Sequence, residues 1–358
     1  MKVLDQRPRI LIITMRRLGD VLLMTPLIRA LKRGFPGCCV DALVFRGTEG
    51  MLEGNRDLDR VIALAQRPSL AEMTALLARL WRRYDLAVAT HAGDRSALLA
   101  WAAGRRRLGL LADADSGAWW KRLVLGHVVR ASSDNHRVIE LLRLADSLGI
   151  PRQDGIVCPA GAISPAAALP GPYAVLHANP MFRIRRWTDE GWRALAAALA
   201  DRGLTVVATG GPDPAEKDYL DRVWSAVEPP VVRVDGKLGW PDLTALLRGA
   251  AVYVGPDTSI THLAAGAGAP TVALYGPASP SLMGPWPIGG LETPWARAGT
   301  VQHRSNVWVV QNPLPCMPCD KLGCDGHLNS RSQCLDELPV QRVLAAVDQA
   351  LALRRVAA

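Results

Sequence analysis

The sequence has no apolar run that approaches the length of about 20 residues needed by a membrane-spanning helix. Residues 1–20 also lack the long apolar stretch and the small-residue cleavage site of a signal peptide. We expect a cytoplasmic protein that is peripheral to the inner membrane.

The chain also lacks an internal repeat, a zinc-finger spacing and any basic strand interleaved with aromatic residues. We therefore expect no nucleic-acid partner, although the net charge of +9 would suit one. The same charge suits an anionic ligand, a phosphorylated glycolipid or the anionic surface of an inner leaflet. Seven cysteines in a cytoplasmic chain argue against a disulfide framework.

The length of 358 residues and the alternation of apolar strand-like runs with helical periods predict two Rossmann-like α/β domains. In the first, we expect strands at 9–14, 40–45, 61–64, 85–90 and 107–110, and helices at 69–83, 96–103 and 134–148. In the second, we expect strands at 173–177, 205–209, 231–234, 252–254 and 271–275, and helices at 188–202, 214–227 and 241–248. We assign residues 1–165 to an acceptor-binding domain and 166–338 to a donor-binding domain. The stretch 155–172 would be a linker with one loose strand, and a last helix within 339–358 would return to the first domain.

The stretch 252–280 organises the second domain. A buried strand ends at Gly255-Pro256, a polar cluster follows, and a helix begins near His262. Ligands of doubly wound sheets bind at such a place, where a helix N-terminus favours phosphate. Two interpretations stay open for Asp257, Thr258 and Ser259: they bind an anion, or they only cap the helix.

Asp20 stands in a similar place after the first strand. Gly19 supplies a tight turn, and Asp20 is either a helix N-cap or a carboxylate at the mouth of the sheet, where a general base would be useful. The basic loop that follows the strand at 173–177 also has two interpretations. Arg183, Arg185 and Arg186 form either a solvated face or an anion site.

The motif Gly-Pro-Asp-Thr-Ser-x-x-His-Leu-Ala-Ala, from Gly255 on, resembles the donor-site signature of the family 9 glycosyltransferases. These heptosyltransferases build the inner core of lipopolysaccharide. Gly19-Asp20-Val21-Leu22 and the loop around Arg185 match the same family in the same order. The resemblance implies a GT-B fold, with two Rossmann-like doubly wound domains facing across a cleft.

The resemblance also implies an activity: inverting transfer of heptose from ADP-L-glycero-D-manno-heptose to an anionic inner-core acceptor. Asp20 would be the base, Arg16 and Arg17 would meet the acceptor, and no cofactor would be required. The implied donor-binding residues are Arg185, Glu216, Leu238, Asp257, Thr258, Ser259 and His262. Ser259 departs from the family, which commonly has glycine there, and the residues near Pro180 lack the family's hydroxyl groups.

Four cysteines form the pattern C-x2-C-x4-C-x9-C inside a loop rich in proline and glycine. Two interpretations stay open: a structural zinc or iron held by four thiolates, or four free thiols. The block is similar to that of the enzymes that add a branching third heptose. The cysteines are Cys316, Cys319, Cys324 and Cys334.

Other functions remain possible on this scaffold. One is a GT-B transferase or an epimerase that uses another nucleotide sugar. Another is a nucleotide-sugar-binding subunit without turnover. A pure binder would not need a carboxylate at Asp20, which favours the enzyme.

Overall fold

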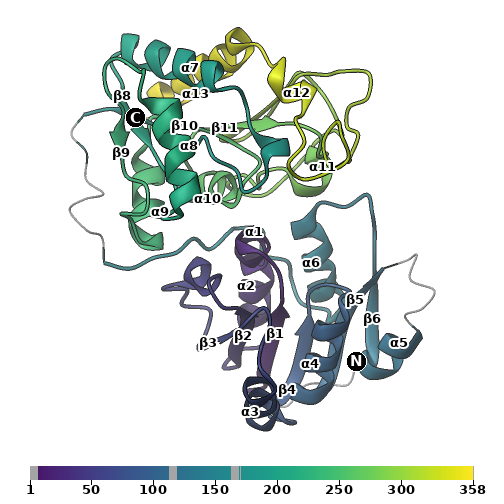
Figure 1. Cartoon of the computed structure of the whole chain (residues 1–358). Helices are drawn as coiled ribbons and strands as arrows, with labels where there is room; N and C mark the ends of the chain where they lie inside the picture. Colours follow the sequence, from purple (N-terminus) through teal and green to yellow (C-terminus); the bar gives the residue numbers. More distant parts are fainter. Residues whose placement is uncertain (1–6, 113–118, 163–168, 170, 358) are drawn as a thin grey trace. The chain divides into compact units, whose positions relative to one another are not determined.

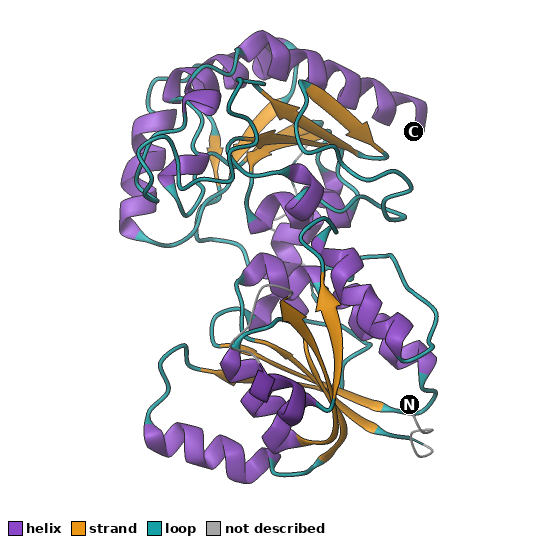
Figure 2. Cartoon of the chain, turned by 90° about the vertical axis from the view of Figure 1, so that its right-hand side faces the viewer, coloured by secondary structure: helices purple, strands orange, loops and turns teal. Residues whose placement is uncertain are grey.

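The computed structural model describes residues 7–112, 119–162, 169 and 171–357, and the chain divides into two compact units, Met1–Pro159 and Ala160–Ala358. Each unit has a twisted sheet with helices on both faces (Figures 1 and 2). The predicted boundary between residues 165 and 166 lies outside the described residues. No strand forms within 155–162, where part of the loose strand was expected.

The first unit has an all-parallel sheet in the order β3-β2-β1-β4-β5-β6. Strand β1 is buried on both faces because helices cover both, which explains its continuous apolar sequence. Helices α2 and α6 pack together, and α4 packs against both α3 and α5. The strands are β1 Arg9–Thr14, β2 Cys39–Phe45, β3 Arg60–Leu64, β4 Tyr84–Ala89, β5 Gly104–Ala112 and β6 His127–Ala131. The helices are α1 Leu18–Leu23, α2 Thr25–Gly34, α3 Leu70–Leu80, α4 Asp94–Ala103, α5 Trp119–Leu125 and α6 Arg137–Ser147, with a 3-10 turn at Glu49–Leu52.

The second unit has the strand order β12-β13-β11-β10-β7-β8-β9, in which only β12 is antiparallel. Helices α7, α8 and α13 pack in one group, and α9 and α10 in another. The strands are β7 Tyr173–Leu176, β8 Thr205–Ala208, β9 Val232–Arg233, β10 Val252–Pro256, β11 Thr271–Tyr275, β12 Val301–Arg304 and β13 Val307–Gln311. The helices are α7 Asp189–Asp201, α8 Pro214–Trp224, α9 Trp240–Gly249, α10 Ser259–Ala267, α11 Pro280–Met283, α12 Gln333–Asp336 and α13 Val340–Ala357, with a 3-10 turn at Arg183–Arg185.

The last helix, α13, uses one face within its own unit. Val343, Ala346, Val347 and Ala350 are buried in the core of that unit, and the helix contacts β11, β13 and α7. Its predicted return to the first domain stays a prediction.

The sequence prediction missed several short elements, among them α5, β6 and the hairpin β12–β13. Helix α5 and strand β6 are short, and β6 lies at the sheet edge with no fully buried residue, so neither has a strong apolar period. The hairpin β12–β13 turns at Ser305-Asn306, where Ser305 has a φ of 49°, without the Asn-Gly or Asp-Gly pair that signals such turns. Within the described part of the chain, no helix combines the length and apolar character needed to cross a bilayer.

Candidate functional site

Asp20 lies within α1, at the edge of the first sheet where β1 ends. Its carboxylate is 9% exposed and contacts two guanidinium groups: Arg16 Nε lies 3.5 Å from Oδ2, and Arg137 Nε lies 3.5 Å from Oδ1. The N-cap position belongs to Arg17, and no side chain caps the helix. The capping interpretation of Asp20 is therefore wrong, and its role as a base stays a prediction.

Sequence reasoning missed Arg137, the first residue of α6. Its side chain is 15% exposed, and its Nη2 donates to the carbonyl of Thr90, 3.0 Å away, at the end of β4. Burial lowers the pKa of Arg137, while the charge of Asp20 opposes this. A charged residue at a helix start usually faces solvent, so the sequence carried no signal for this contact.

His91 belongs to the same group of side chains. It follows Thr90, and its ring nitrogen lies 3.2 Å from the hydroxyl of Ser96. Burial first, and the charges of Arg16 and Arg137 next, lower the pKa of His91 to about 4. The imidazole is therefore neutral near pH 7.

The predicted acceptor residues Arg16 and Arg17 differ in their surroundings. The Arg16 side chain is 54% exposed and reaches Asp20, whereas Arg17 is exposed at the helix start. A contact of either with an acceptor stays a prediction.

In the second unit, the structure brings together Arg185 and Asp257, which lie in loops after β7 and β10. The guanidinium Nη1 donates to the backbone carbonyl of Asp257 at 2.9 Å and lies 3.2 Å from its Oδ2. Because β7 and β10 are adjacent parallel strands, the two loops share one edge of the sheet. The Arg185 side chain remains 34% exposed, so it can also reach a ligand.

Asp257 itself is buried and orients its neighbours. Tyr275 donates its hydroxyl to Oδ1 at 3.4 Å. Burial raises the pKa of Asp257, and Arg185 opposes that rise. The carboxylate thus holds the guanidinium in place at the start of α10.

Thr258 is the N-cap of α10, since its hydroxyl accepts from the backbone N–H of Thr261 at 3.3 Å. The capping interpretation is confirmed for Thr258. Ser259 occupies the first helical position and is partly exposed, while His262 is buried on the same helix. Phosphate binding by this helix start stays a prediction.

The Glu216 carboxylate lies beside the turn that follows β8. A Cβ atom at Gly211 would lie 2.7 Å from Glu216 Oε2, so the glycine makes room for the carboxylate. Asp213 caps α8 by accepting from the backbone N–H groups of Ala215 and Glu216. Leu238 lies half-buried in the loop between β9 and α9. Their contacts with a nucleoside stay predictions.

The other two arginines of the basic loop, Arg183 and Arg186, have different surroundings. Arg186 lies over the ring of Tyr219, 4.1 Å from its centroid, and donates to Asn179. Arg183 is exposed, and its charge opposes the rise in the pKa of Asp336 that burial causes. Only Arg185 faces Asp257.

Cys316, Cys319 and Cys324 lie in the loop after β13, and Cys334 lies near them in α12. Burial, and then the charges of Cys319, Cys324 and Cys316, raise the pKa of Cys334 to about 12. Among the described residues, however, no three His, Cys, Asp or Glu side chains are placed to hold a metal ion. The geometry therefore does not form a metal site, and the metal stays a prediction.

Comparison with known proteins gives a family. The model of glycosyltransferase family 9 (heptosyltransferase) matches residues 73–289, more than half of the chain. Lipopolysaccharide heptosyltransferase 3 of Escherichia coli is 26% identical, with 76% of this chain and 84% of the relative covered. Lipopolysaccharide heptosyltransferase 1 of Pseudomonas aeruginosa is 27% identical, with 88% and 87% covered.

Solved structures share the fold along nearly the whole chain. The family 9 glycosyltransferase of Veillonella parvula superposes with a TM-score of 0.76 at 17% identity, covering 98% of this chain and 99% of that one. E. coli heptosyltransferase WaaC with ADP gives 0.71 at 21% identity, covering 96% and 99%. The iron-containing dodecameric glycosyltransferase TibC of E. coli gives 0.56 at 15% identity, covering 98% and 77%. The predicted GT-B fold is confirmed.

The buried His177 and the partly buried His91 predict how stability depends on pH. Burial lowers the pKa of His177 to about 4, as it does for His91, whereas the unfolded value is about 6.5. The unfolded chain then binds more protons between these values, so stability present above pH 6.5 is lost as the pH falls toward 4. Urea unfolding across this range should show the loss, and His177→Gln should reduce its slope. Ring resonances of His177 and His91 that titrate near pH 6.5 in the folded protein would contradict this prediction.

Proposed function

Because the chain belongs to glycosyltransferase family 9 and is a glycosyltransferase of the GT-B fold, we propose that it transfers heptose from ADP-L-glycero-D-manno-heptose to the lipopolysaccharide inner core, with inversion. The observation that carries the proposal is the meeting of Arg185, Asp257 and the start of α10 at one edge of the second sheet. The names of the curated relatives supply the sugar and the acceptor. Relatives named heptosyltransferase 1 and 3 are about equally similar, so we propose no position on the core.

The donor's diphosphate would lie at that edge. The strand order of the second unit reverses between β7 and β10, and α/β sheets bind ligands at such a point. A diphosphate there would meet the planar fork of Arg185 and the free backbone N–H groups of α10. A solved structure of the same fold contains ADP, which agrees with this choice of ligand.

The reaction needs a base and a stabilised leaving group. Asp20 would accept the proton of the acceptor hydroxyl while the oxygen of that hydroxyl forms a bond to the anomeric carbon. The bond from that carbon to the ADP oxygen breaks on the opposite face, and ADP leaves with the bonding electrons. Arg185 and the start of α10 would stabilise the charge that develops on the diphosphate.

The charge of the chain supports a proposal for the acceptor and the location. Arg16 is the exposed cation nearest the proposed base and would meet anionic groups of the core. The net charge of +9 supports work at the cytoplasmic face of the inner membrane, whose anionic lipids attract basic proteins. No cofactor is proposed for catalysis.

Replacing Asp20 tests the base. Asp20→Asn should lower kcat by about 10²–10⁴-fold, because the amide cannot accept the proton. Transfer to a truncated core acceptor measures this, and retained ADP binding together with a thermal melt controls for folding around Arg137. Unchanged turnover would remove Asp20 from the mechanism, whereas nucleotide binding with no turnover in the unmodified protein would favour a binding subunit.

Replacing Arg185 tests the diphosphate site. Charge-assisted hydrogen bonds contribute about 1.5–3 kcal/mol each, so Arg185→Ala should weaken ADP binding by about 10- to 100-fold. Arg185→Lys should restore only part, because a lysine lacks the planar fork. Calorimetry with ADP and AMP measures this, and AMP should be affected much less. Arg183→Ala is the matched control in the same loop, and an equal loss in both variants would reject the assignment.

The four cysteines remain to be tested. If they bind a metal, its role is structural, because four thiolates leave no open position for a substrate. In that case the purified chain should contain about one zinc or iron, and Cys319→Ser should lower both metal content and melting temperature. Cys39→Ser, at an exposed thiol elsewhere, is the control. Metal-free protein with unchanged stability in Cys319→Ser would establish free thiols.

A further inference from the structure

The exposed tryptophans of the described residues all lie in one part of the first unit. Trp81 ends α3, Trp101 lies on α4 and Trp119 begins α5, with exposed fractions of 52%, 37% and 67%. Leu98 and Leu123 are also exposed, one turn from Trp101 and Trp119 respectively. We call these five residues the tryptophan patch.

The helices that carry the tryptophan patch pack together, and two of its tryptophans are in contact. The rings of Trp81 and Trp101 meet edge to face, with centroids 5.5 Å apart. Helix α4 packs against both α3 and α5 and lies between them (Figure 1). Single exposed apolar side chains need no explanation, but a cluster of this size marks an interaction surface.

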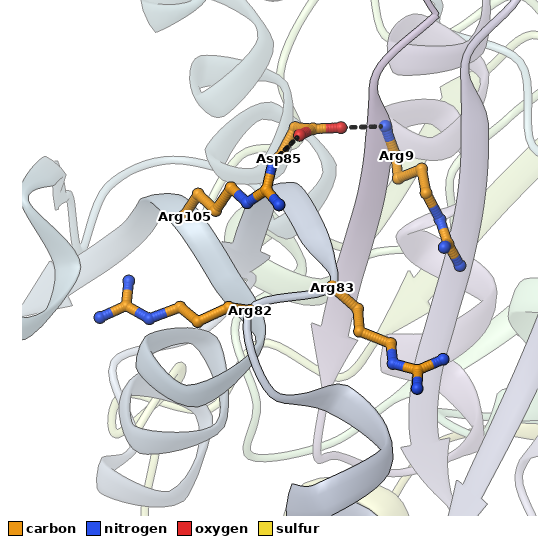
Figure 3. A pocket seen from close by; sticks show the side chains of 5 residues that line it. All are labelled: Arg9, Arg82, Arg83, Asp85 and Arg105. Carbon is orange, nitrogen blue, oxygen red and sulfur yellow. Dashed lines mark hydrogen bonds and ion pairs between the residues drawn. The ribbon is translucent and has the colours of Figure 1, made fainter.

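A pocket of about 450 Å³ lies where β1, β4 and β5 begin (Figure 3). Four arginines and one aspartate line it. Asp85 accepts from the backbone N–H of Arg9 at 2.9 Å, and its other oxygen lies 3.5 Å from Arg105 Nη1. We call this lining the arginine pocket: Arg9, Arg82, Arg83, Asp85 and Arg105.

Arg82 joins the pocket to the patch. Its guanidinium carbon lies 5.8 Å from the ring centroid of Trp81 and 5.9 Å from that of Trp101. Burial and the charge of Arg82 also lower the pKa of nearby Arg107, whose buried Nε has no hydrogen-bond partner in the described structure. These neighbouring positive charges favour an anionic partner.

We propose that the tryptophan patch and the arginine pocket together form a surface that docks on an anionic lipid bilayer. Tryptophan is enriched at membrane interfaces, where its ring enters the boundary region. Arginines beside it pair with anionic headgroups. A soluble anion would engage the arginines but leave the tryptophans without a role, so the combination favours a bilayer.

The surface leaves the candidate catalytic edge uncovered. The arginine pocket lies where β1 begins, and Asp20 follows the end of that strand. Six strand residues span about 20 Å, so a bilayer bound at the pocket would lie about that far from the edge that holds Asp20. The proposal rests on the proposed function in one respect only: the acceptor is linked to a lipid and extends from the bilayer to Asp20.

Flotation with vesicles tests the surface. The full chain should bind vesicles of equal phosphatidylglycerol and phosphatidylcholine at 0.1 M salt, and hardly bind phosphatidylcholine alone. Each basic residue near an anionic surface contributes about a five-fold factor, so Arg83→Glu with Arg105→Glu should weaken partition at least about 25-fold. Trp119→Ser with Leu123→Ser should weaken it at least about ten-fold, because apolar burial is lost.

The matched control is Lys217→Glu with Arg248→Glu, two exposed residues of the second unit that change the net charge equally. It should retain binding, and thermal melts should show all variants folded. An equal loss in the control, no vesicle binding by the unmodified chain, or binding to heparin alone would each overturn the proposal.

Activity separates this proposal from the proposed function. Transfer of heptose to a delipidated core acceptor should be unchanged in both surface variants. A chain that binds vesicles through this surface but transfers no heptose would reject the proposed function and still support the docking surface.

Discussion

The reversal of strand order at the middle of each sheet is the constraint on which both candidate sites depend. In the first sheet the chain builds outward from β1 to β3, and then returns to the other side of β1 with β4. In the second it does the same around β7 and β10. The loops that follow the two central strands run in opposite directions and leave a crevice between them. Side chains from distant segments of the chain meet in this crevice. Arg185 with Asp257 arises in this way; in the first unit Asp20 and Thr90 follow β1 and β4, and Arg137 reaches both of them from α6.

Backbone pairing places these groups more precisely than any side-chain interaction could alone. Val254 pairs with Leu176, the last residue of β7, so the loop after β7 begins two residues before β10 ends at Pro256. In the first sheet, the hydroxyls of Thr14 and Thr90 bond at 2.7 Å where β1 and β4 end. Both arrangements are buried, which keeps the loop starts rigid while their exposed ends remain available to ligands.

The sequence predicted the architecture well because buried parallel strands are continuous apolar runs. It also placed Asp20, Arg185 and Asp257 at strand ends, where the structure has them. It could not predict Arg137, because a guanidinium at a helix start looks the same whether it faces solvent or a buried carboxylate. Nor could it distinguish the arginines of one loop: only the fold shows that Arg186 covers Tyr219 while Arg185 turns to Asp257.

The two edges of the first sheet differ in how their charge is balanced. At the edge where β1 ends, the Asp20 carboxylate contacts Arg16 and Arg137, whereas at the opposite edge the arginine pocket has one carboxylate for four guanidinium groups. The strand between them is about 20 Å long, and the Debye length at physiological salt is about 8 Å. Over that distance the field of the exposed arginines is weakened at Asp20 by screening in the solvent and by separation within the protein. A positive surface can thus be maintained on this domain without altering the ionic surroundings of the proposed base.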